Sequence, residues 1–263
     1  MRTPRLVALD MDGTLLDGSG ALPPRWPEVA ARAEAAGMIL APASGRQLAT
    51  LRAMFPDRDT FLAENGTVIM HKGQVVSTTE IAPADVAEIL DAADTLTVAH
   101  TLLLCTPETA YVVPASLDEA AQAELEKYYK SVTYIKDLRA VTDPVIKVAV
   151  FCGRGSEKHL YPTFASTVGH LGVAVSGQVW LDIMSPDGNK GAGLRQLADA
   201  TGVAVADTAA FGDFLNDYEL LEAAGYAVAM ENAHPRLKEI ADRIAPPNTE
   251  YGVLTVLEEW LGA

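Results

Sequence analysis

Two aspartates separated by one residue directly follow a short apolar run near the start of the chain. Residues 6–9 are all apolar, which is typical of a strand buried on both faces, and the segment D-M-D-G-T-L at 10–15 comes straight after them. In an open parallel sheet, ligands bind beyond the carboxyl ends of the strands, so Asp10 and Asp12 can both face one site. Gly13 allows the sharp turn that this requires. Paired carboxylates at a strand end therefore predict a site for metal-assisted or acid–base chemistry.

Three other segments at predicted strand ends supply groups that complement these carboxylates. Ser44-Gly45 offers a hydroxyl and backbone N–H groups before a helix, which suits a phosphate oxygen. Lys190, in D-G-N-K-G, offers a positive charge at the start of another helix, and the segment G-D-F-L-N-D at 212–217 offers two acids and an amide. Because the predicted metal ligands are hard oxygen atoms with no Cys or His beside them, we expect Mg²⁺ rather than zinc.

The elements that must position these segments alternate between short apolar strands and helical patterns, which is typical of a parallel sheet. We expect a doubly wound α/β core built from residues 1–81 and 185–263, with an α+β module of about 82–184 inserted into it. Within this module, Ser116 and Glu119 predict a capping box that opens a helix. The expected strands of the core are 6–9, 38–41, 60–63, 208–211, 226–230 and 243–244, and its expected helices are 28–36, 47–54, a segment after 190, a segment from 234 and a final helix into 260.

The composition indicates a folded, soluble protein that does not bind polyanions. Of the 263 residues 49% are apolar, and 20 Lys and Arg stand against 35 Asp and Glu, which gives a formal net charge of −15. This charge repels nucleic acid and anionic membrane surfaces, whereas a small anionic substrate is allowed where a metal ion or a lysine reverses the sign locally.

The two cysteines, Cys105 and Cys152, are too few for a disulfide scaffold, and no apolar run is long enough for a signal peptide or a membrane span. We therefore expect a cytoplasmic protein whose partner is a small phosphorylated metabolite, with no nucleic acid or membrane partner. The sequence leaves the oligomeric state open.

The four segments described above occur in the order and context of the haloacid dehalogenase (HAD) superfamily, which the chain resembles over nearly its whole length. They are D-x-D-G-T-L at 10–15, S-G-R at 44–46, the lysine before G-x-G-L at 190–194, and G-D-x-x-N-D at 212–217. The module between the serine and the lysine resembles the type-two cap of the Cof-type branch. Two positions depart from the family pattern: Asn189, where a serine is more usual before the lysine, and Glu231, where a glycine is frequent.

The resemblance implies a two-step phosphoryl transfer. By similarity to the family, Asp10 is the nucleophile that attacks phosphorus and forms an aspartyl-phosphate. Asp12 protonates the leaving alcohol and then activates the water that hydrolyses this intermediate. The same resemblance implies that Mg²⁺ is held by the Asp10 carboxylate, the Asp12 backbone carbonyl and Asp213. For the two aspartates of the first segment, the alternative role is a turn that ends the strand.

The remaining residues of the predicted site bind the phosphoryl group or support it. Asp217 is expected to support Lys190 or a metal-bound water, and Arg46 and Asn65 are candidate substrate contacts that could instead lie at the surface or in a turn. For Ser44, Asn216 and Asp217, the alternative role is to cap the helix that follows them. The residues expected to hold phosphoryl oxygens are Ser44, the Gly45 amide, the Met11 amide, Lys190 and Asn216.

The resemblance thus implies a Mg²⁺-dependent phosphatase that hydrolyses small phosphate monoesters, such as sugar phosphates or related metabolites, with the inserted module selecting the leaving group. Two alternatives share this chemistry: a dedicated sugar-phosphate phosphatase of the sucrose-phosphate or mannosyl-phosphoglycerate type, and a phosphomannomutase. The alternative from another class is a non-catalytic phospho-acceptor regulator that keeps Asp10 phosphorylated. Asp12 argues against this last alternative, because a phospho-acceptor gains nothing from an acid placed to protonate a leaving group.

Overall fold

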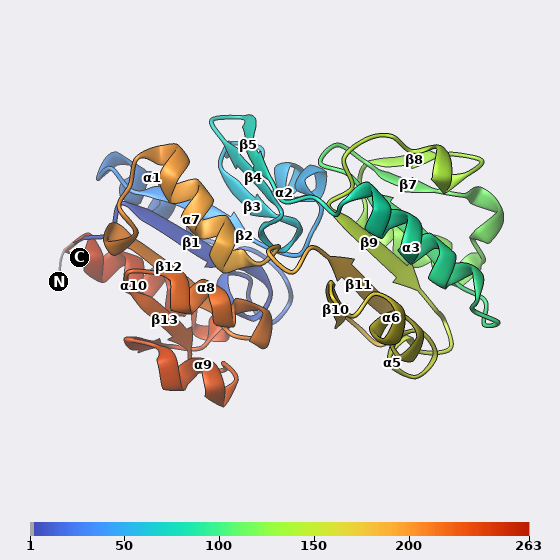
Figure 1. Cartoon of the computed structure of the whole chain (residues 1–263). Coiled ribbons are helices and arrows are strands. Elements are labelled where there is room, and N and C mark those ends of the chain that lie inside the picture. Colours follow the sequence, from blue (N-terminus) through green and yellow to red (C-terminus); the bar gives the residue numbers. More distant parts are fainter. Residues whose placement is uncertain (1–2, 263) are drawn as a thin grey trace. The chain divides into compact units, whose positions relative to one another are not determined.

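The computed structural model describes residues 3–262, and the chain divides into two compact units (Figure 1). The first unit consists of Met1–Gly45, Asp57–Ser77 and Asn189–Ala263, and the second consists of Arg46–Pro56 and Thr78–Gly188. The long segment of the second unit lies within a few residues of the expected inserted module. The short segment was expected in the core, and it is the main difference from the expected division.

The first unit contains a twisted sheet whose strand order is β14-β13-β12-β1-β2-β3-β4-β5. The strands from β14 to β3 are parallel to their neighbours, and β4 is antiparallel to β3. This mainly parallel sheet confirms the predicted α/β core. The bounds of the strands are β1 Leu6–Asp10, β2 Ile39–Ala43, β3 Phe61–Ala63, β4 Val68–His71, β5 Gln74–Thr78, β12 Thr208–Gly212, β13 Ala227–Met230 and β14 Arg243–Ala245.

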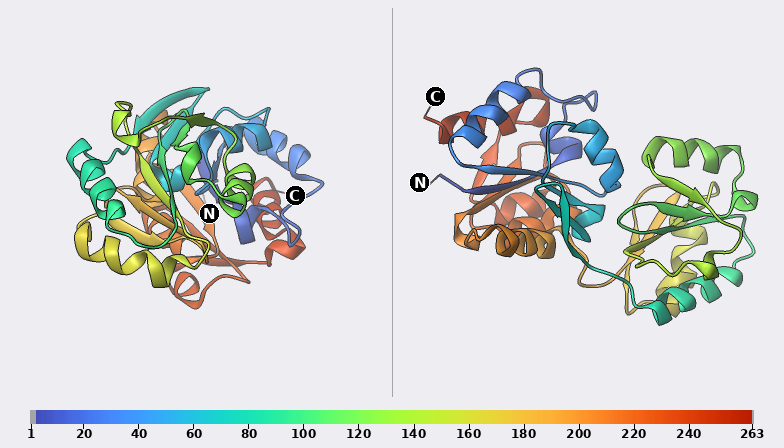
Figure 2. Two further views of the ribbon diagram at one scale, coloured as in Figure 1. Left: turned by 90° about the vertical axis from the view of Figure 1, so that its right-hand side faces the viewer. Right: turned by 90° about the horizontal axis from the view of Figure 1, so that it is seen from above.

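Helices cover both faces of this sheet (Figures 1 and 2). Helices α1 (Trp26–Ala35) and α10 (Gly252–Trp260) pack together on one face. Helices α7 (Lys190–Thr201), α8 (Tyr218–Ala223) and α9 (Pro235–Ile240) pack on the other. A sheet covered in this way buries its central strands on both sides, and every residue of β1 is buried.

The register of the central strands determines which residues meet beyond their carboxyl ends. Asp10 of β1 lies opposite Ala43 of β2, and Leu9 lies opposite Phe211 of β12. The residues that follow these three strands therefore leave the sheet at the same edge. Ligands of parallel sheets bind at this edge, where the predicted site residues Asp10, Ser44 and Asp213 end or directly follow their strands.

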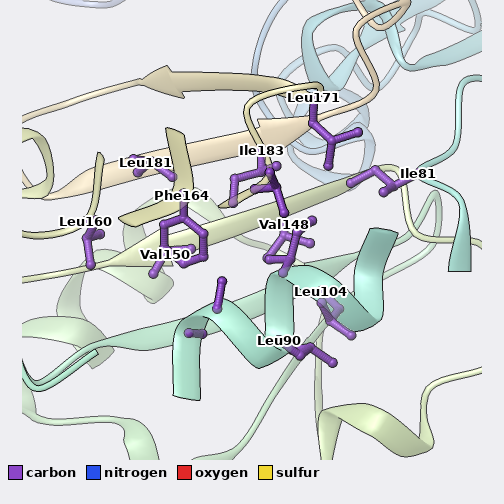
Figure 3. Close-up of a cluster of buried hydrophobic side chains, with 14 of the residues drawn as sticks. Ile81, Leu90, Leu104, Val148, Val150, Leu160, Phe164, Leu171, Leu181 and Ile183 are labelled. Atoms are coloured by element: carbon purple, nitrogen blue, oxygen red, sulfur yellow. The ribbon is translucent and has the colours of Figure 1, made fainter. Parts of the chain in front are cut away.

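The second unit contains a six-stranded sheet in the order β10-β11-β9-β6-β7-β8, which is antiparallel except for the pairing of β7 with β8. One face of this sheet packs against α3 (Pro83–Asp94), α5 (Ser156–His159) and α6 (Tyr161–Thr167) around an apolar cluster that includes Val148, Phe164 and Ile183 (Figure 3). The bounds of the strands are β6 Thr101–Cys105, β7 Ala110–Val112, β8 Val132–Tyr134, β9 Lys147–Phe151, β10 Gly172–Val175 and β11 Trp180–Met184.

Helix α2 (Leu48–Met54) belongs to the second unit because side chains at its start bond the backbone of the turn at 128–131. The buried Gln47 side chain accepts hydrogen bonds from two backbone N–H groups of this turn at 3.1 and 2.9 Å, and it donates one to a carbonyl at 2.8 Å. Thr50 Oγ1 donates a further bond at 3.2 Å. A buried amide that satisfies three backbone groups holds the two segments together.

The predicted capping box of the inserted module is wrong. Helix α4 (Glu119–Tyr128) begins at Asp118, whose Oδ1 accepts the Ala121 N–H at 2.8 Å. Ser116 instead donates to the Val113 carbonyl at 2.8 Å, within a short 3₁₀ turn that begins at Pro114. Because Pro114 begins a turn in which the Ser116 hydroxyl is already hydrogen-bonded, Asp118, two residues after the serine, becomes the N-cap.

The thiols of Cys105 and Cys152 are both buried. Among residues 3–262, no helix has the length and apolar character that crossing a membrane requires.

At the start of α9, the His234 side chain accepts the Arg236 N–H and caps the helix.

Candidate active site

Three of the predicted residues form a buried charge cluster in the first unit. The Lys190 Nζ donates to Asp10 Oδ1 at 2.5 Å and to Asp217 Oδ1 at 2.6 Å. Lys190 is 1% exposed and Asp10 is 6% exposed, so the interaction is shielded from water. Asp10 ends β1, whereas Asp217 ends the 3₁₀ turn that follows β12, and one ammonium group joins them.

Lys190 reaches this position because the start of α7 packs unusually closely against its neighbours. A Cβ on Gly191 would lie 2.1 Å from the Glu219 carbonyl oxygen, so only glycine fits there. The Asn189 side chain caps the helix by accepting the Ala192 N–H at 2.8 Å. An asparagine therefore fills the capping role that a serine would have at this position.

The segment at 212–217 folds around its own last aspartate. Asp217 Oδ2 accepts the Asp213 N–H at 3.1 Å and the Phe214 N–H at 3.3 Å, while its other oxygen binds the lysine. A Cβ on Gly212 would lie 2.5 Å from the Asp217 Cβ, so the glycine makes room for this side chain. Asn216 is exposed on the adjoining 3₁₀ turn, where its side chain is open to solvent.

The loop after β1 is held by the expected Gly13 and Asp213 together with two residues that were not predicted, Thr14 and Asn232. Gly13 has a φ of +81° and packs directly against the Asp213 carboxylate, where a Cβ would come within 2.2 Å of Oδ2. Thr14 Oγ1 donates to Asp213 Oδ1 at 3.3 Å, and Asn232 Nδ2 donates to the Gly13 carbonyl at 2.8 Å. Thr14 lies within the D-x-D-G-T-L motif, and this position is the sequence signal that could have marked it as a site residue. Asp12 is exposed on this loop.

Burial shifts the pKa values of the site, and the excess of acidic over basic groups adds to the shift of the aspartates. Burial and the nearby Asp217 raise the pKa of Asp10 to about 8, although Lys190 acts in the opposite direction. Burial and Asp217 also raise the pKa of Asp213 to about 6. Burial by itself lowers the pKa of Lys190, but its two carboxylate partners outweigh this effect and raise it above its ordinary value. A bound cation would favour the ionised form of both aspartates.

The donor set of the cluster fits a hard divalent cation. Carboxylate oxygens of Asp10, Asp213 and Asp217 all lie within 4.8 Å of one another, and the group contains no histidine or cysteine. Oxygen-only donors favour Mg²⁺ or a similar ion over zinc. Both carboxylates of the predicted metal site, those of Asp10 and Asp213, belong to this group.

The predicted phosphate-binding residues after β2 lie beside a turn of the same unit. Ser44 is 4% exposed, and its carbonyl accepts the Asn65 N–H at 2.9 Å. The Asn65 side chain packs against Gly45, where a Cβ would lie 3.0 Å from Oδ1. Arg46 falls in the second unit, where its Nη1 donates to the Met54 sulfur at 3.9 Å.

Comparison with known proteins identifies the family. A family model of the haloacid dehalogenase-like hydrolases matches residues 7–257, so the chain belongs to this hydrolase family. Its similarity to phosphatases and hydrolases of the Cof type confirms the predicted branch.

Relatives with assigned names cover almost all of the chain. The 5-amino-6-(5-phospho-D-ribitylamino)uracil phosphatase YbjI of Escherichia coli K12 is 29% identical over 262 residues, which cover 98% of this chain and 96% of that protein. The HMP-PP phosphatase of Cronobacter sakazakii is 30% identical over 239 residues, covering 89% and 86% of the two chains. The solved structure of a haloacid dehalogenase-like hydrolase from Bacteroides thetaiotaomicron has a TM-score of 0.82 at 26% identity, covering 98% of this chain and 99% of that one.

Proposed function

We propose that the protein is a Mg²⁺-dependent phosphatase that hydrolyses small phosphate monoesters through an aspartyl-phosphate on Asp10. The observation that carries this proposal is the buried carboxylate of Asp10 at the end of β1, 2.5 Å from the Lys190 ammonium and grouped with the carboxylate of Asp213. A carboxylate held beside a fixed ammonium group is arranged to attack an electrophilic, negatively charged phosphoryl group. The names of the two relatives described above also support phosphatase activity.

In the first step, a carboxylate oxygen of Asp10 attacks phosphorus while the bond from phosphorus to the ester oxygen breaks. Asp12 donates a proton to the departing oxygen, so an alcohol leaves rather than an alkoxide. The exposure of Asp12 on the loop after β1 supports this role, because its carboxyl is open to a substrate.

In the second step, water replaces Asp10 on phosphorus. Asp12, now ionised, takes a proton from the water, whose oxygen attacks the phosphorus of the aspartyl-phosphate. The bond from phosphorus to the Asp10 carboxylate oxygen breaks, inorganic phosphate is released, and the Asp10 carboxylate is regenerated. The enzyme thereby returns to its starting state.

Mg²⁺ bound by the Asp10 carboxylate, the Asp12 backbone carbonyl and Asp213 would neutralise charge between the nucleophile and the phosphoryl group. The fit of the carboxylate oxygens to a hard cation supports this ion. Thr14 and Gly13 orient Asp213 through a hydrogen bond and direct packing. Such support is needed because a misplaced ligand weakens metal binding.

Phosphoryl oxygens would be held by Lys190 together with the Ser44 hydroxyl, the Gly45 and Met11 amides and Asn216. The geometry at Lys190 supports its part, because Asp217 accepts one of its hydrogen bonds and keeps the ammonium beside Asp10. Asp217 is thus proposed to position Lys190. The other bond to Asp10 would be shared with a phosphoryl oxygen once substrate is bound.

The substrate class that we propose is a small phosphorylated sugar or related metabolite in the cytoplasm, with residues 82–184 selecting the leaving group. The relatives' names support a small substrate, since one is named for a phosphoribityl compound and the other for HMP-PP. The net charge of −15 supports a small anion over nucleic acid, because only a local cation can offset the field of the whole protein.

The test is phosphate release from a panel of sugar phosphates, nucleotides and other phosphorylated metabolites, with Mg²⁺ and with a chelator. We expect release that requires the metal and is lost in the Asp10→Asn variant. An isomerised product without free phosphate would contradict hydrolysis in favour of a mutase. A long-lived phosphorylated Asp10 without turnover would contradict it in favour of a phospho-acceptor.

A further inference from the structure

The turn that joins β3 to β4 has an unusual backbone. Glu64, Asn65 and Gly66 have φ values of +51°, +55° and +85°, so three successive residues lie in the left-handed region. This region is unfavourable for residues other than glycine, and asparagine tolerates it better than most. Two antiparallel strands can be joined by a short turn without this strain at a glutamate. Joining β3 to β4 therefore does not by itself account for the left-handed backbone of this turn.

One side of this turn lies against the loop that follows β2. The Asn65 N–H donates to the Ser44 carbonyl at 2.9 Å. The amide group of the same side chain packs on Gly45, where an added Cβ would lie 3.0 Å from Oδ1 and 3.1 Å from Nδ2. Asn65 thus contacts both residues of the peptide unit that links Ser44 to Gly45, through its backbone and its side chain.

The other side of the turn lies against the start of α7. A Cβ on Gly66 would lie 2.5 Å from the Asn189 carbonyl oxygen and 2.8 Å from the Lys190 Cα. A Cβ on Gly193, one turn further along the helix, would lie 2.9 Å from the Gly66 Cα. Backbone is packed on backbone here, so the turn and the helix have little freedom to move against each other.

The Gly45 N–H is the group whose direction this packing controls. Among residues 3–262 this N–H donates to no backbone carbonyl, whereas the N–H of the preceding residue, Ser44, donates to the Leu62 carbonyl at 2.9 Å. A free backbone N–H is an effective donor to an anion only if its direction is fixed in advance.

We propose that Asn65 is a positioning residue that orients the Gly45 N–H toward the phosphoryl group at a fixed spacing from Lys190. This inference rests on the proposed function, because it assumes that both groups bind the same phosphate. Asn65 acts through Gly45 and through the turn anchored on α7. Its loss should weaken phosphoryl binding more than it slows the chemical steps, since the nucleophile and the acid are untouched.

The test uses two substitutions at position 65 and a matched substitution elsewhere in the same unit. Asn65→Gly removes the side chain but fits the left-handed backbone, whereas Asn65→Ala removes it and adds backbone strain. Lys72, at φ +51° in the exposed turn between β4 and β5, supplies the control, because Lys72→Gly relieves the same strain away from Gly45. Inorganic phosphate is the probe, measured as a competitive inhibitor and by its effect on the Tm.

We expect both variants at position 65 to raise the Ki of phosphate and the KM by about tenfold, with a smaller change in kcat, because a hydrogen bond to a charged group is weakened. The Tm of Asn65→Ala should fall by about 2–4 °C, whereas that of Asn65→Gly should not. Lys72→Gly should leave the Ki and KM unchanged. A wild-type Ki and KM in Asn65→Gly would overturn the proposal, since the side chain would then have no effect on phosphate.

Failure of the proposed function would be distinguishable. If the wild type hydrolyses no member of the panel but its Tm rises with phosphate, the proposed function fails. The positioning role is then tested by whether Asn65→Gly loses that rise in Tm. A wild type that neither hydrolyses a phosphate ester nor binds phosphate would overturn both.

Discussion

The Lys190 Nζ lies 2.5 Å from Asp10 Oδ1, although 180 positions separate the two residues in the chain. The lysine begins α7, and the aspartate ends the central strand of the sheet. Asp217 binds the same ammonium at 2.6 Å, so a single buried cation faces two buried carboxylates. The stability of this part of the fold and the chemistry proposed for it therefore depend on the same three side chains.

Replacing Lys190 by methionine should destabilise the protein and abolish turnover. Breaking a buried ion pair from one side leaves uncompensated charge and costs about 3–5 kcal/mol. Adding Asp217→Asn should recover part of the loss, because one of the two stranded charges is removed. Urea unfolding measures both effects, with Lys158→Met on the exposed surface as the control. Equal stability of Lys190→Met and the wild type would contradict the ion-pair geometry.

Asp10→Asn should abolish turnover while the fold is retained. The change removes the nucleophilic charge but keeps the size of the side chain, and we expect kcat to fall by about a thousandfold or more. Asp199→Asn, on the exposed side of α7, is the control, because it removes an acid without touching the site. Phosphate release measures both variants. A rate near that of the wild type in Asp10→Asn would rule out the covalent mechanism.

Asp12→Asn should separate metal binding from proton transfer. The backbone carbonyl of residue 12 remains, so the affinity for Mg²⁺, measured by its effect on the Tm, should be close to that of the wild type. Both chemical steps should slow by about a hundredfold to ten-thousandfold, the usual contribution of a general acid or base. Single-turnover kinetics report the two steps separately. An unaltered rate would remove Asp12 from the proton-transfer role.

The stability of the protein in chelator should decrease as the pH rises. The pKa of Asp10 is raised to about 8 and that of Asp213 to about 6, chiefly by burial. These carboxyls hold their protons more tightly in the folded state, so their contribution to stability is fully present below about pH 4 and is lost as the pH rises toward 8.

We therefore expect the Tm in chelator to fall between about pH 5 and pH 8, and added Mg²⁺ to raise it most at the upper end, where the metal compensates the ionised oxygens. Asp10→Asn should show a weaker dependence on pH, because it removes the group with the larger shift. Thermal unfolding across this range is the measurement. A Tm in chelator that rises steadily with pH would contradict the assigned direction.

Gln47→Leu should destabilise the second unit. The change keeps the approximate size of the side chain but leaves two backbone N–H groups and one carbonyl of the turn at 128–131 without their partner. We expect a loss of about 2–3 kcal/mol in urea unfolding. Gln122→Leu, which removes an exposed hydrogen bond from the Gln122 side chain to Glu126, should change stability by less than about 0.5 kcal/mol. Equal effects of the two substitutions would contradict the buried role of Gln47.

The sequence predicted the sheet and its carboxyl-end residues because both depend on local signals. An apolar run followed by Asp10 marks a buried strand end, and parallel strands present their ends at one edge. The lysine, the two acids of the segment at 212–217 and the aspartates after β1 all fall in the unit that contains this sheet. Their exact partners, such as Thr14 for Asp213, depend on how loops fold against one another, which has no periodic signal in the chain.

The misplaced features have the same kind of origin. The capping box failed because Pro114 changed the local geometry before the helix began. The segment at 46–56 was expected in the core because it follows a core strand, yet hydrogen bonds from Gln47 to residues far along the chain group it with the second unit. Long-range contacts of this kind are invisible to sequence periodicity.

The grouping of residues 46–56 with the second unit has a consequence for modular exchange. If the second unit were transplanted from a relative, a transfer of residues 78–188 alone would separate Gln47 from the backbone groups that it satisfies. The shorter segment would have to travel with the longer one. The unit consists of two pieces, one of which begins directly after Gly45, so a recombination that exchanges the whole unit must also cut the chain beside the proposed phosphate-binding loop.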